Sequence, residues 1–360
     1  MLRRYCQNIR VLQPTAQRLL LTGNSTGCST ATFQRKFASF SLNRLARFRD
    51  QVRAATKRRP LAELQKESGQ KLEFADSIPV RPGTHLWRAL GFTVGVSAVV
   101  YTVTAVVESL KEIQEHHRLQ DTFQDLTLPI PDLFTSEEEQ SPIPIEVKQL
   151  TDGQKTILAI IGLNALVCLV WRIPQTKALM YRWFTNSFAS KSLCTPMLLS
   201  VFSHYSFLHL ALNMYVLYSF APIAVERFLG VEQFIAFFTT AGVLSSFTSL
   251  VQKYAVRSNV RALGASGAIC AILAYTCMRI PEARLSIIFM PFFTFSAEQA
   301  IYGLIAIDLL GLLFRFRLFD HAAHLGGSLF GLFYASYGED WVRKHFYPFI
   351  TRVCEWYFAA

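Results

Sequence analysis

Long apolar runs recur along this chain from residue 89 onward. Six of them contain no Asp, Glu, Lys or Arg; one of these, at 195–224, holds His204, His209 and Asn213, and the remaining run, at 299–314, holds Asp308. Each run has the length that a helix needs to cross a bilayer with modest tilt. The pattern therefore predicts seven membrane-spanning helices, at residues 89–107, 156–171, 195–224, 234–251, 262–278, 299–314 and 322–338.

The first run stands apart from the other six because a long polar segment follows it. This segment contains four prolines and a run of three glutamates. The expected fold is an all-α membrane protein in which a six-helix core is preceded by one additional N-terminal transmembrane helix (1+6). We expect the extra helix at 89–107, an acidic Pro-containing linker at 108–150, the core at 151–340 and a C-terminal tail at 341–360.

Composition supports a polytopic membrane protein. Of the 360 residues, 51% are hydrophobic and 17% charged, and the mean hydropathy is +0.27. The net charge of +11 does not indicate nucleic-acid binding, because the basic residues lie at the N-terminus and between apolar runs. The seven cysteines are scattered without a Cys-x-x-Cys pair, so neither a disulfide framework nor a zinc cluster is predicted.

The N-terminal 49 residues contain many Arg, Ser and Thr but no Asp or Glu. This composition is typical of a mitochondrial transit peptide, although a simple basic tail has the same composition. We expect a transit peptide and basic region at 1–60, without fixing the cleavage point. A polar segment at 61–88 is expected on the matrix side.

Lys and Arg are unevenly distributed over the loops. The loops after the second, fourth and sixth runs are basic, whereas segment 108–150 and the loops after the third and fifth runs contain acidic residues. Basic loops resist translocation. With a matrix-targeted N-terminus, this asymmetry predicts a multi-pass protein of the mitochondrial inner membrane, with the N-terminus in the matrix and the C-terminus in the intermembrane space.

Ser266 lies in the sequence Gly264-Ala265-Ser266-Gly267, where an apolar run begins. At a helix N-terminus, unpaired backbone N–H groups and the helix dipole can hold an oxyanion beside such a hydroxyl. Gly264 and Gly267 leave room for a substrate carbonyl or a neighbouring backbone. Taken alone, this pattern is equally typical of ordinary capping and close packing.

His324 begins a second pattern of small residues. His324, Gly327 and Gly331 are spaced i, i+3 and i+7 and so share one helix face. The serine helix has a matching stripe of Gly267, Ala271 and Ala274. Two such stripes allow close helix packing, which can bring the histidine within hydrogen-bond reach of Ser266. A neutral imidazole there is suited to act as a general base.

No third, acidic member of this site is evident in the sequence. Asp308 and Asp320 are candidates by their proximity in sequence, but Asp308 lies two turns inside its predicted helix, and Asp320 lies four residues before His324. The sequence therefore predicts a Ser-His dyad.

A third group of polar residues lies in the run at 195–224. His209 and Asn213 are four residues apart on one helix face, where an imidazole N–H and an amide can support an oxyanion. A metal site made by His204, His209, His321 and His324 is the competing interpretation. These histidines lack the spacing of a zincin helix, so neither a metal nor a cofactor is predicted.

These motifs together resemble the rhomboid family of intramembrane serine proteases, and specifically its mitochondrial presenilin-associated rhomboid-like branch. The resemblance spans residues 155–340 and includes a Glu-x-x-x-Gly turn at 226–230. It implies the 1+6 fold and a cofactor-free Ser-His protease that forms an acyl-enzyme. The implied partners are single-pass transmembrane substrates in mitochondrial quality control, membrane dynamics or apoptosis, together with the lipid bilayer. A homo-oligomer is left open.

The extra helix of that branch corresponds to 89–107, where Gly91 and Gly95 form a small-residue pair that can dock on the core. The chain departs from the family at two places. Pro196 and Met197 replace a Trp-Arg pair of bacterial relatives, and Cys270 replaces an aromatic residue. Two other function classes remain as alternatives: a catalytically inactive relative that binds membrane clients, and a transporter or channel.

Overall fold

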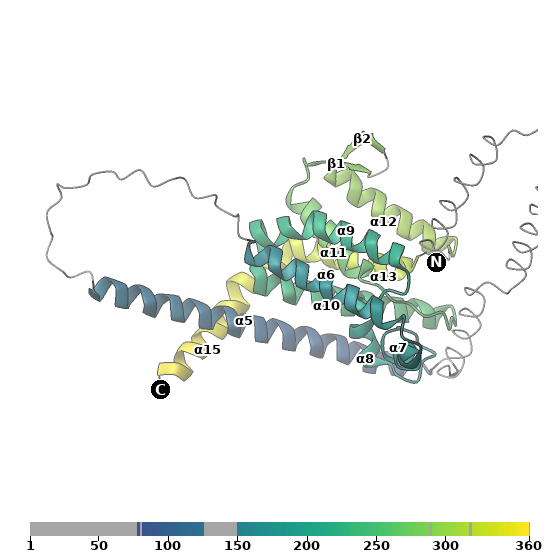
Figure 1. Ribbon diagram of the computed structural model, residues 1–360, viewed down its shortest axis with the longest axis horizontal. Helices are drawn as coiled ribbons and strands as arrows, with labels where there is room; N and C mark the ends of the chain where they lie inside the picture. The colour runs from purple at the N-terminus through teal and green to yellow at the C-terminus, as the bar shows by residue number, and fades with distance from the viewer. Residues whose placement is uncertain (1–77, 80, 126–149, 288–289, 317–318, 360) are drawn as a thin grey trace, which may run out of the picture. The chain divides into compact units, whose positions relative to one another are not determined.

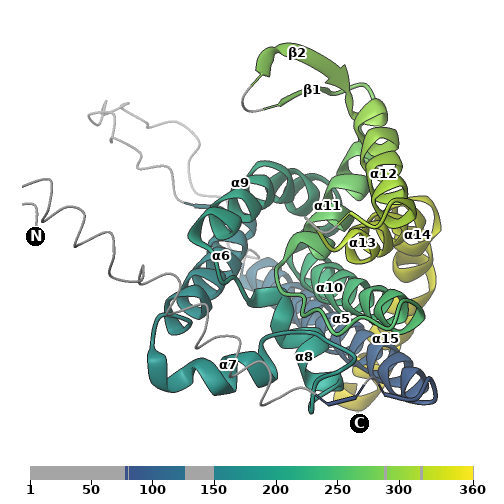
Figure 2. The ribbon, with the colours of Figure 1, turned by 90° about the vertical axis from the view of Figure 1, so that its right-hand side faces the viewer.

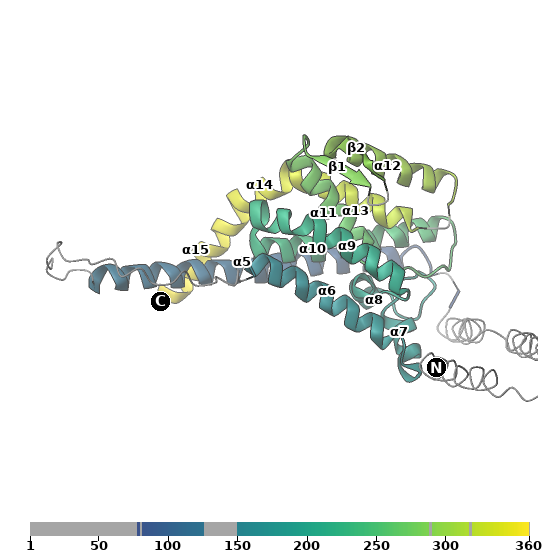
Figure 3. The same cartoon turned by 45° about the horizontal axis from the view of Figure 1, so that its top comes forward.

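The computed structural model describes residues 78–79, 81–125, 150–287, 290–316 and 319–359. The predicted transit peptide lies outside the described residues. Within the described residues the protein is helical, apart from a short hairpin of two strands (Figures 1 and 3). Its elements are α5 (His85–Asp125), α6 (Asp152–Val170), η1 (Pro174–Thr176), α7 (Lys177–Trp183), α8 (Cys194–Leu199), η2 (Ser200–Phe202), α9 (Phe207–Ala224), η3 (Val225–Leu229), α10 (Gly230–Ala255), α11 (Ser266–Arg279), β1 (Arg284–Ile287), β2 (Met290–Ser296), α12 (Ala297–Leu313), α13 (His321–Phe333), η4 (Tyr334–Gly338), α14 (Glu339–Trp341), η5 (Val342–Phe346) and α15 (Tyr347–Ala359).

Helix α11 lies inside the bundle and packs against α9, α10, α12 and α13 (Figure 2). Its sequence is apolar on nearly every side, and residues 267–272 and 274–277 are buried. A helix that is apolar all round lies either in a protein core or against lipid, and here neighbouring helices cover it. Ile272 and Tyr275 join Phe237 of α10 in the largest apolar cluster. The helix that begins at Ser266 is therefore held in place by four neighbouring helices.

Helix α5 packs on α10 and α15. The contact does not use the expected glycines, because a Cβ at Gly91 or Gly95 would meet nothing within 4 Å. Ala89, Thr93 and Ala105 are buried instead. The side of α5 that packs on the core is therefore next to the Gly91–Gly95 pair and does not include it. A pair of small residues does not by itself determine which side of a helix is covered.

The predicted boundaries of α5 need correction. The segment expected to be a linker from 108 onward is helical as far as Asp125. Residues 108–125 contain three Glu and three Gln, together with Leu, Lys and Arg, all of which favour helix, whereas their charge alone had indicated a linker. The part of the linker at 126–149 lies outside the described residues.

The predicted helix at 195–224 is interrupted. Helix α8 and the 3-10 turn η2 are followed by an extended segment, and α9 begins only at Phe207. Ser206 caps α9 by accepting a hydrogen bond from the backbone N–H of His209 at 3.5 Å. The indole N–H of Trp171 donates to Ser203 Oγ at 2.9 Å and holds the extended segment. His204 therefore precedes α9 and is not part of it.

Two further elements were not predicted. Strands β1 and β2 pair antiparallel, with Arg284 opposite Ser296. The segment expected to be a C-terminal tail is helical up to residue 359, and its last helix, α15, is tied to α5 by a 2.8 Å hydrogen bond between Thr351 and Ser109.

Helices occupy all seven segments in which spans were predicted, but their number does not establish the 1+6 arrangement. Within the described residues, three stretches are long and apolar enough to cross a membrane: 85–120, 152–170 and 207–255. The last of these combines α9, η3 and α10, and the α11 stretch is shorter. Gly230, with φ +74°, separates η3 from the regular turns of α10. The number of crossings therefore stays a prediction.

Candidate active site

Ser266 is the first residue of α11, and the loop before it is fixed at several points. The backbone N–H of Gly264 donates to Ser200 O at 2.9 Å, and Asn186 pairs with Ala262 in an isolated β-bridge. Gly264 has φ +126°, which side chains rarely tolerate, and a Cβ there would lie 2.9 Å from His209 Cε1. This loop therefore places the Ser266 hydroxyl at the N-terminus of α11.

His324 lies one turn into α13, and its Nε2 is 2.8 Å from Ser266 Oγ. The two helices meet backbone to backbone. A Cβ at Gly327 would lie 2.0 Å from Gly267 O, and one at Gly331 would lie 2.3 Å from Ala271 O. Only glycine fits at these two positions of α13. The small-residue stripes thus allow the approach that brings the serine and the histidine into contact.

Asp308 of α12 lies on the other side of His324. Its Oδ1 is 3.5 Å from His324 Nδ1 and 2.8 Å from His321 Nδ1. Asp308 is only 1% exposed. Asp308 was one of two acidic candidates in the sequence, but it could not be singled out, because the register between α12 and α13 cannot be read from sequence separation. The sequence feature that pointed to this contact was a carboxylate, Asp308, within an apolar run, followed by two histidines spaced i, i+3, His321 and His324.

His209 lies against the loop before α11, whereas the described partner of the Asn213 amide is His204. The Asn213 Nδ2 and His204 Nε2 atoms are 3.0 Å apart, and the His204 and His209 rings meet edge to face at 4.9 Å. His209 borders Gly264 and lies within electrostatic range of His324. The structure thus brings His209 near the serine loop and uses His204 to orient Asn213.

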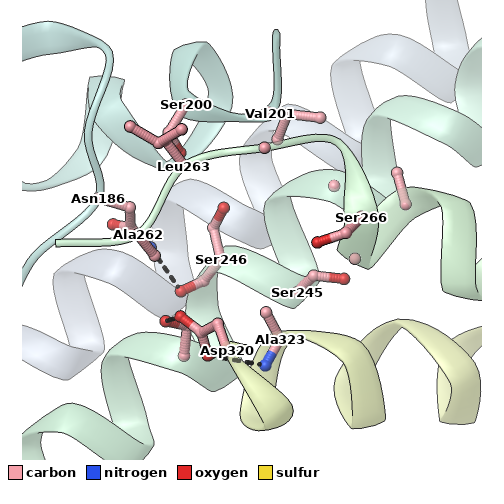
Figure 4. Close-up of a pocket in the computed structure, with 15 residues that line it drawn as sticks. Asn186, Ser200, Val201, Ser245, Ser246, Ala262, Leu263, Ser266, Asp320 and Ala323 are labelled. Atoms are coloured by element: carbon pink, nitrogen blue, oxygen red, sulfur yellow. Dashed lines mark hydrogen bonds between the residues drawn. The ribbon is translucent and has the colours of Figure 1, made fainter. Parts of the chain in front are cut away.

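A polar cavity lies beside Ser266 (Figure 4). Hydroxyl groups from α10 and η2 line it together with the backbone at the start of α11. Such a lining offers several hydrogen-bond partners to water in an otherwise apolar bundle. The lining residues that carry side-chain polar atoms are Asn186, Ser200, Ser245, Ser246, Ser249, Ser266 and Asp320.

The start of α13 is fixed by Asp320, whose carboxylate accepts from the backbone N–H of Ala323 at 3.2 Å. Ser249 Oγ and Lys253 Nζ of α10 donate to the same carboxylate at 2.5 and 3.0 Å. Burial alone would raise the pKa of Asp320, but Lys253 and these hydrogen bonds outweigh burial and hold that pKa below its usual value. The ionised carboxylate therefore caps the helix that carries His324.

Within the described residues, no three His, Cys, Asp or Glu side chains are placed to hold a metal ion. His204 and His209 neighbour each other, whereas His321 and His324 face Asp308. The four histidines proposed as metal ligands thus form two separate pairs, His204 with His209 and His321 with His324.

The chain matches known proteins over most of its length. A rhomboid domain model matches residues 191–339. The mitochondrial presenilin-associated rhomboid-like protein of Homo sapiens is 43% identical over 282 residues, which cover 77% of this chain and 72% of that protein. The mitochondrial presenilin-associated rhomboid-like protein A of Danio rerio is 46% identical over 201 residues, covering 56% of this chain and 52% of that protein. The mitochondrial rhomboid protein 1 of Saccharomyces cerevisiae is 28% identical over 196 residues, covering 54% of this chain and 56% of that protein.

Proposed function

Because this chain belongs to the rhomboid family of intramembrane serine proteases, we propose that it cleaves transmembrane segments of mitochondrial membrane proteins, with Ser266 as nucleophile and His324 as general base. The observation that carries this proposal is the 2.8 Å contact between Ser266 Oγ and His324 Nε2 among apolar helices. By resemblance to the presenilin-associated branch, the substrates are single-pass proteins of quality control, membrane dynamics or apoptosis.

The chemistry follows from this contact. His324 Nε2 accepts the Ser266 proton as Oγ attacks the carbonyl carbon of the scissile bond. His324 then gives that proton to the leaving amine nitrogen, and the peptide bond breaks to leave an acyl-enzyme on Ser266. Water from the polar cavity, deprotonated by His324, hydrolyses the ester and regenerates the serine. No step needs a metal or a cofactor.

The negative oxygen of the tetrahedral intermediate needs hydrogen-bond donors. The backbone N–H groups at the start of α11 are such donors, and we assign the side chains of His209 and Asn213 to support them. Gly264 leaves the space beside His209 open, because a Cβ there would lie 2.9 Å from His209 Cε1. The hydrogen bond to His204 holds the Asn213 amide by one N–H and leaves the other for the oxyanion.

Asn213→Ala is therefore expected to lower kcat by about 10²- to 10³-fold, which is the usual cost of losing one oxyanion donor. KM should change little, because the donor acts mainly in the transition state. Kinetics of reporter cleavage measure both constants. Asn164→Ala is the matched control, since within the described residues the Asn164 amide donates to the backbone of its own helix, at Ile160 O. A wild-type kcat for Asn213→Ala would remove Asn213 from the oxyanion site.

A direct test of the function uses purified full-length protein in liposomes together with a single-pass transmembrane reporter. The wild type should cut the reporter within or beside its membrane segment, and Ser266→Ala should cut it at least about 10⁴-fold more slowly. The rival function, client binding without catalysis, predicts that the wild type retains the reporter uncut. Ser219→Ala, on the exposed side of α9, serves as the control for loss of a hydroxyl.

Like the relatives that it matches, the chain is a mitochondrial multi-pass membrane protein. The alternation of basic and acidic loops supports a finer proposal, with seven spans in the inner membrane, the N-terminus in the matrix and the C-terminus in the intermembrane space. In mitoplasts, added protease should therefore remove a C-terminal tag. Protection of this tag until the inner membrane is dissolved would reverse the orientation.

A further inference from the structure

Asp308 is a buried acidic side chain that the dyad mechanism does not use. Its carboxylate lies between two histidines of α13: Oδ1 is 2.8 Å from His321 Nδ1 and 3.5 Å from His324 Nδ1. The second oxygen, Oδ2, is buried and has no hydrogen-bond partner within the described part of the chain. An ionised group in an apolar helix bundle is costly unless it is paired, so its position beside the proposed base calls for an explanation.

We propose that Asp308 is a positioning residue for the reaction. It holds His324 in the tautomer and orientation that accept the Ser266 proton, and it stabilises the imidazolium that forms. The inference rests on the proposed roles of Ser266 and His324. It extends the predicted dyad to a chain of interactions from Ser266 through His324 to Asp308, with His321 as the outer support.

The tautomer of His324 follows from what lies beside its two ring nitrogens. Nδ1 faces the Asp308 carboxylate, which accepts hydrogen bonds, so the neutral ring carries its proton on Nδ1. Nε2 then has a free lone pair, 2.8 Å from the Ser266 hydroxyl. The opposite tautomer would place a lone pair against the carboxylate and an N–H against the hydroxyl. Asp308 thus favours the one neutral form that can act as a base.

The charge of Asp308 acts during proton transfer. When His324 takes the serine proton it becomes positive, and the nearest carboxylate oxygen is 3.5 Å from its Nδ1. In a bundle of low dielectric, this attraction is stronger than it would be in water. The distance is longer than a good hydrogen bond, but catalytic contacts often tighten only when substrate binds. The unpartnered Oδ2 is a second acceptor available for such a closer contact.

His321 orients the carboxylate, since its Nδ1 donates at 2.8 Å to Oδ1, the same oxygen that lies 3.5 Å from His324 Nδ1. The ring fits against α12 only because residue 311 is glycine: a Cβ there would lie 2.4 Å from three atoms of the His321 ring. Gly303 on the same helix has open space, with nothing within 4 Å of an added Cβ. The chain therefore provides a matched pair of glycines, only one of which supports the carboxylate.

Asp308→Asn tests the role of the charge with little change in shape. In soluble serine proteases the corresponding change in a triad lowers kcat by about 10⁴-fold. Because the contact here is longer, we expect kcat to fall by at least about 10²-fold. KM for the reporter and the thermal midpoint in detergent should stay near their wild-type values, which a purely structural role would not predict. Reporter cleavage in liposomes and thermal unfolding supply these readouts.

Gly311→Ala tests the same proposal without touching Asp308. It should displace the His321 ring and lower kcat by about tenfold or more, whereas Gly303→Ala should leave kcat unchanged. This pair decides the question if Asp308→Asn fails to fold. A wild-type kcat in Asp308→Asn, or equal kcat values in the two glycine variants, would overturn the role of Asp308. Inactive Ser266→Ala beside active wild type would at the same time leave the proposed function intact, so the two failures are distinguishable.

Discussion

Alanine in place of Ser266 or His324 is expected to lower kcat for reporter cleavage by at least about 10⁴-fold. Ser266→Ala removes the oxygen that forms the acyl-enzyme. His324→Ala leaves that oxygen in place but removes the base 2.8 Å away, and within the described residues no other side chain is recorded in a hydrogen bond with this hydroxyl. Single-turnover cleavage in liposomes, followed over long incubations, measures the residual rate of each variant.

The double variant distinguishes a catalytic pair from two independent contributions. If the serine and the histidine act as one unit, Ser266→Ala/His324→Ala should be no slower than either single variant, because the second change removes nothing that still functions. Independent roles would instead make the losses multiply. Ser266→Ala retaining more than about a tenth of wild-type kcat would contradict the assignment of the nucleophile.

Gly327→Ala is expected to lower both stability and activity, and the cause is packing. Alanine is normally favoured over glycine within a helix, by about 1 kcal/mol. Here the added Cβ would lie 2.0 Å from the carbonyl oxygen of Gly267, which is backbone and cannot move aside. Overpacking of this kind costs about 1–3 kcal/mol and forces α13 away from α11. A shift of about 1 Å at the catalytic pair lowers the rate by about 10²-fold.

The measurements are the thermal midpoint in detergent and reporter cleavage at a temperature where the variant stays folded. Gly162→Ala is the control, because it makes the same change in helix α6 where an added Cβ meets nothing within 4 Å. It should keep wild-type activity and unfold at an equal or higher temperature. The close approach of the two helices would be refuted by a Gly327→Ala protein with wild-type kcat and midpoint.

Much of the site could be predicted from sequence because its patterns are local. Glycines at i+3 and i+7 from a histidine share a helix face whatever surrounds that helix. The matching stripe after Ser266 then leaves one plausible way for the two helices to meet. The same reasoning failed at Gly91 and Gly95, where the glycines are open and Ala89 is buried. A small-residue pair permits close packing but does not require it.

The contact of Asp308 with His324 could not be predicted, since it depends on how α12 is placed along α13. Residues 308 and 324 are on different helices, and no spacing rule relates positions across an interface. The break before α9 was missed for a related reason. Residues 203–206 are part of an apolar run, and what makes them extended is a hydrogen bond from Trp171, more than thirty residues earlier. Such long-range contacts are decided by tertiary structure.

The central claim is that Ser266 is a nucleophile activated by His324. Its most direct test is labelling of the membrane-embedded protein with a fluorophosphonate, followed by peptide mass spectrometry to locate the phosphonyl adduct and by rate measurements. We predict an adduct on Ser266 in the wild type and in Gly303→Ala, and at least a hundredfold slower labelling in His324→Ala. An adduct on a different serine, or labelling of Ser266 at an unchanged rate without His324, would contradict the account.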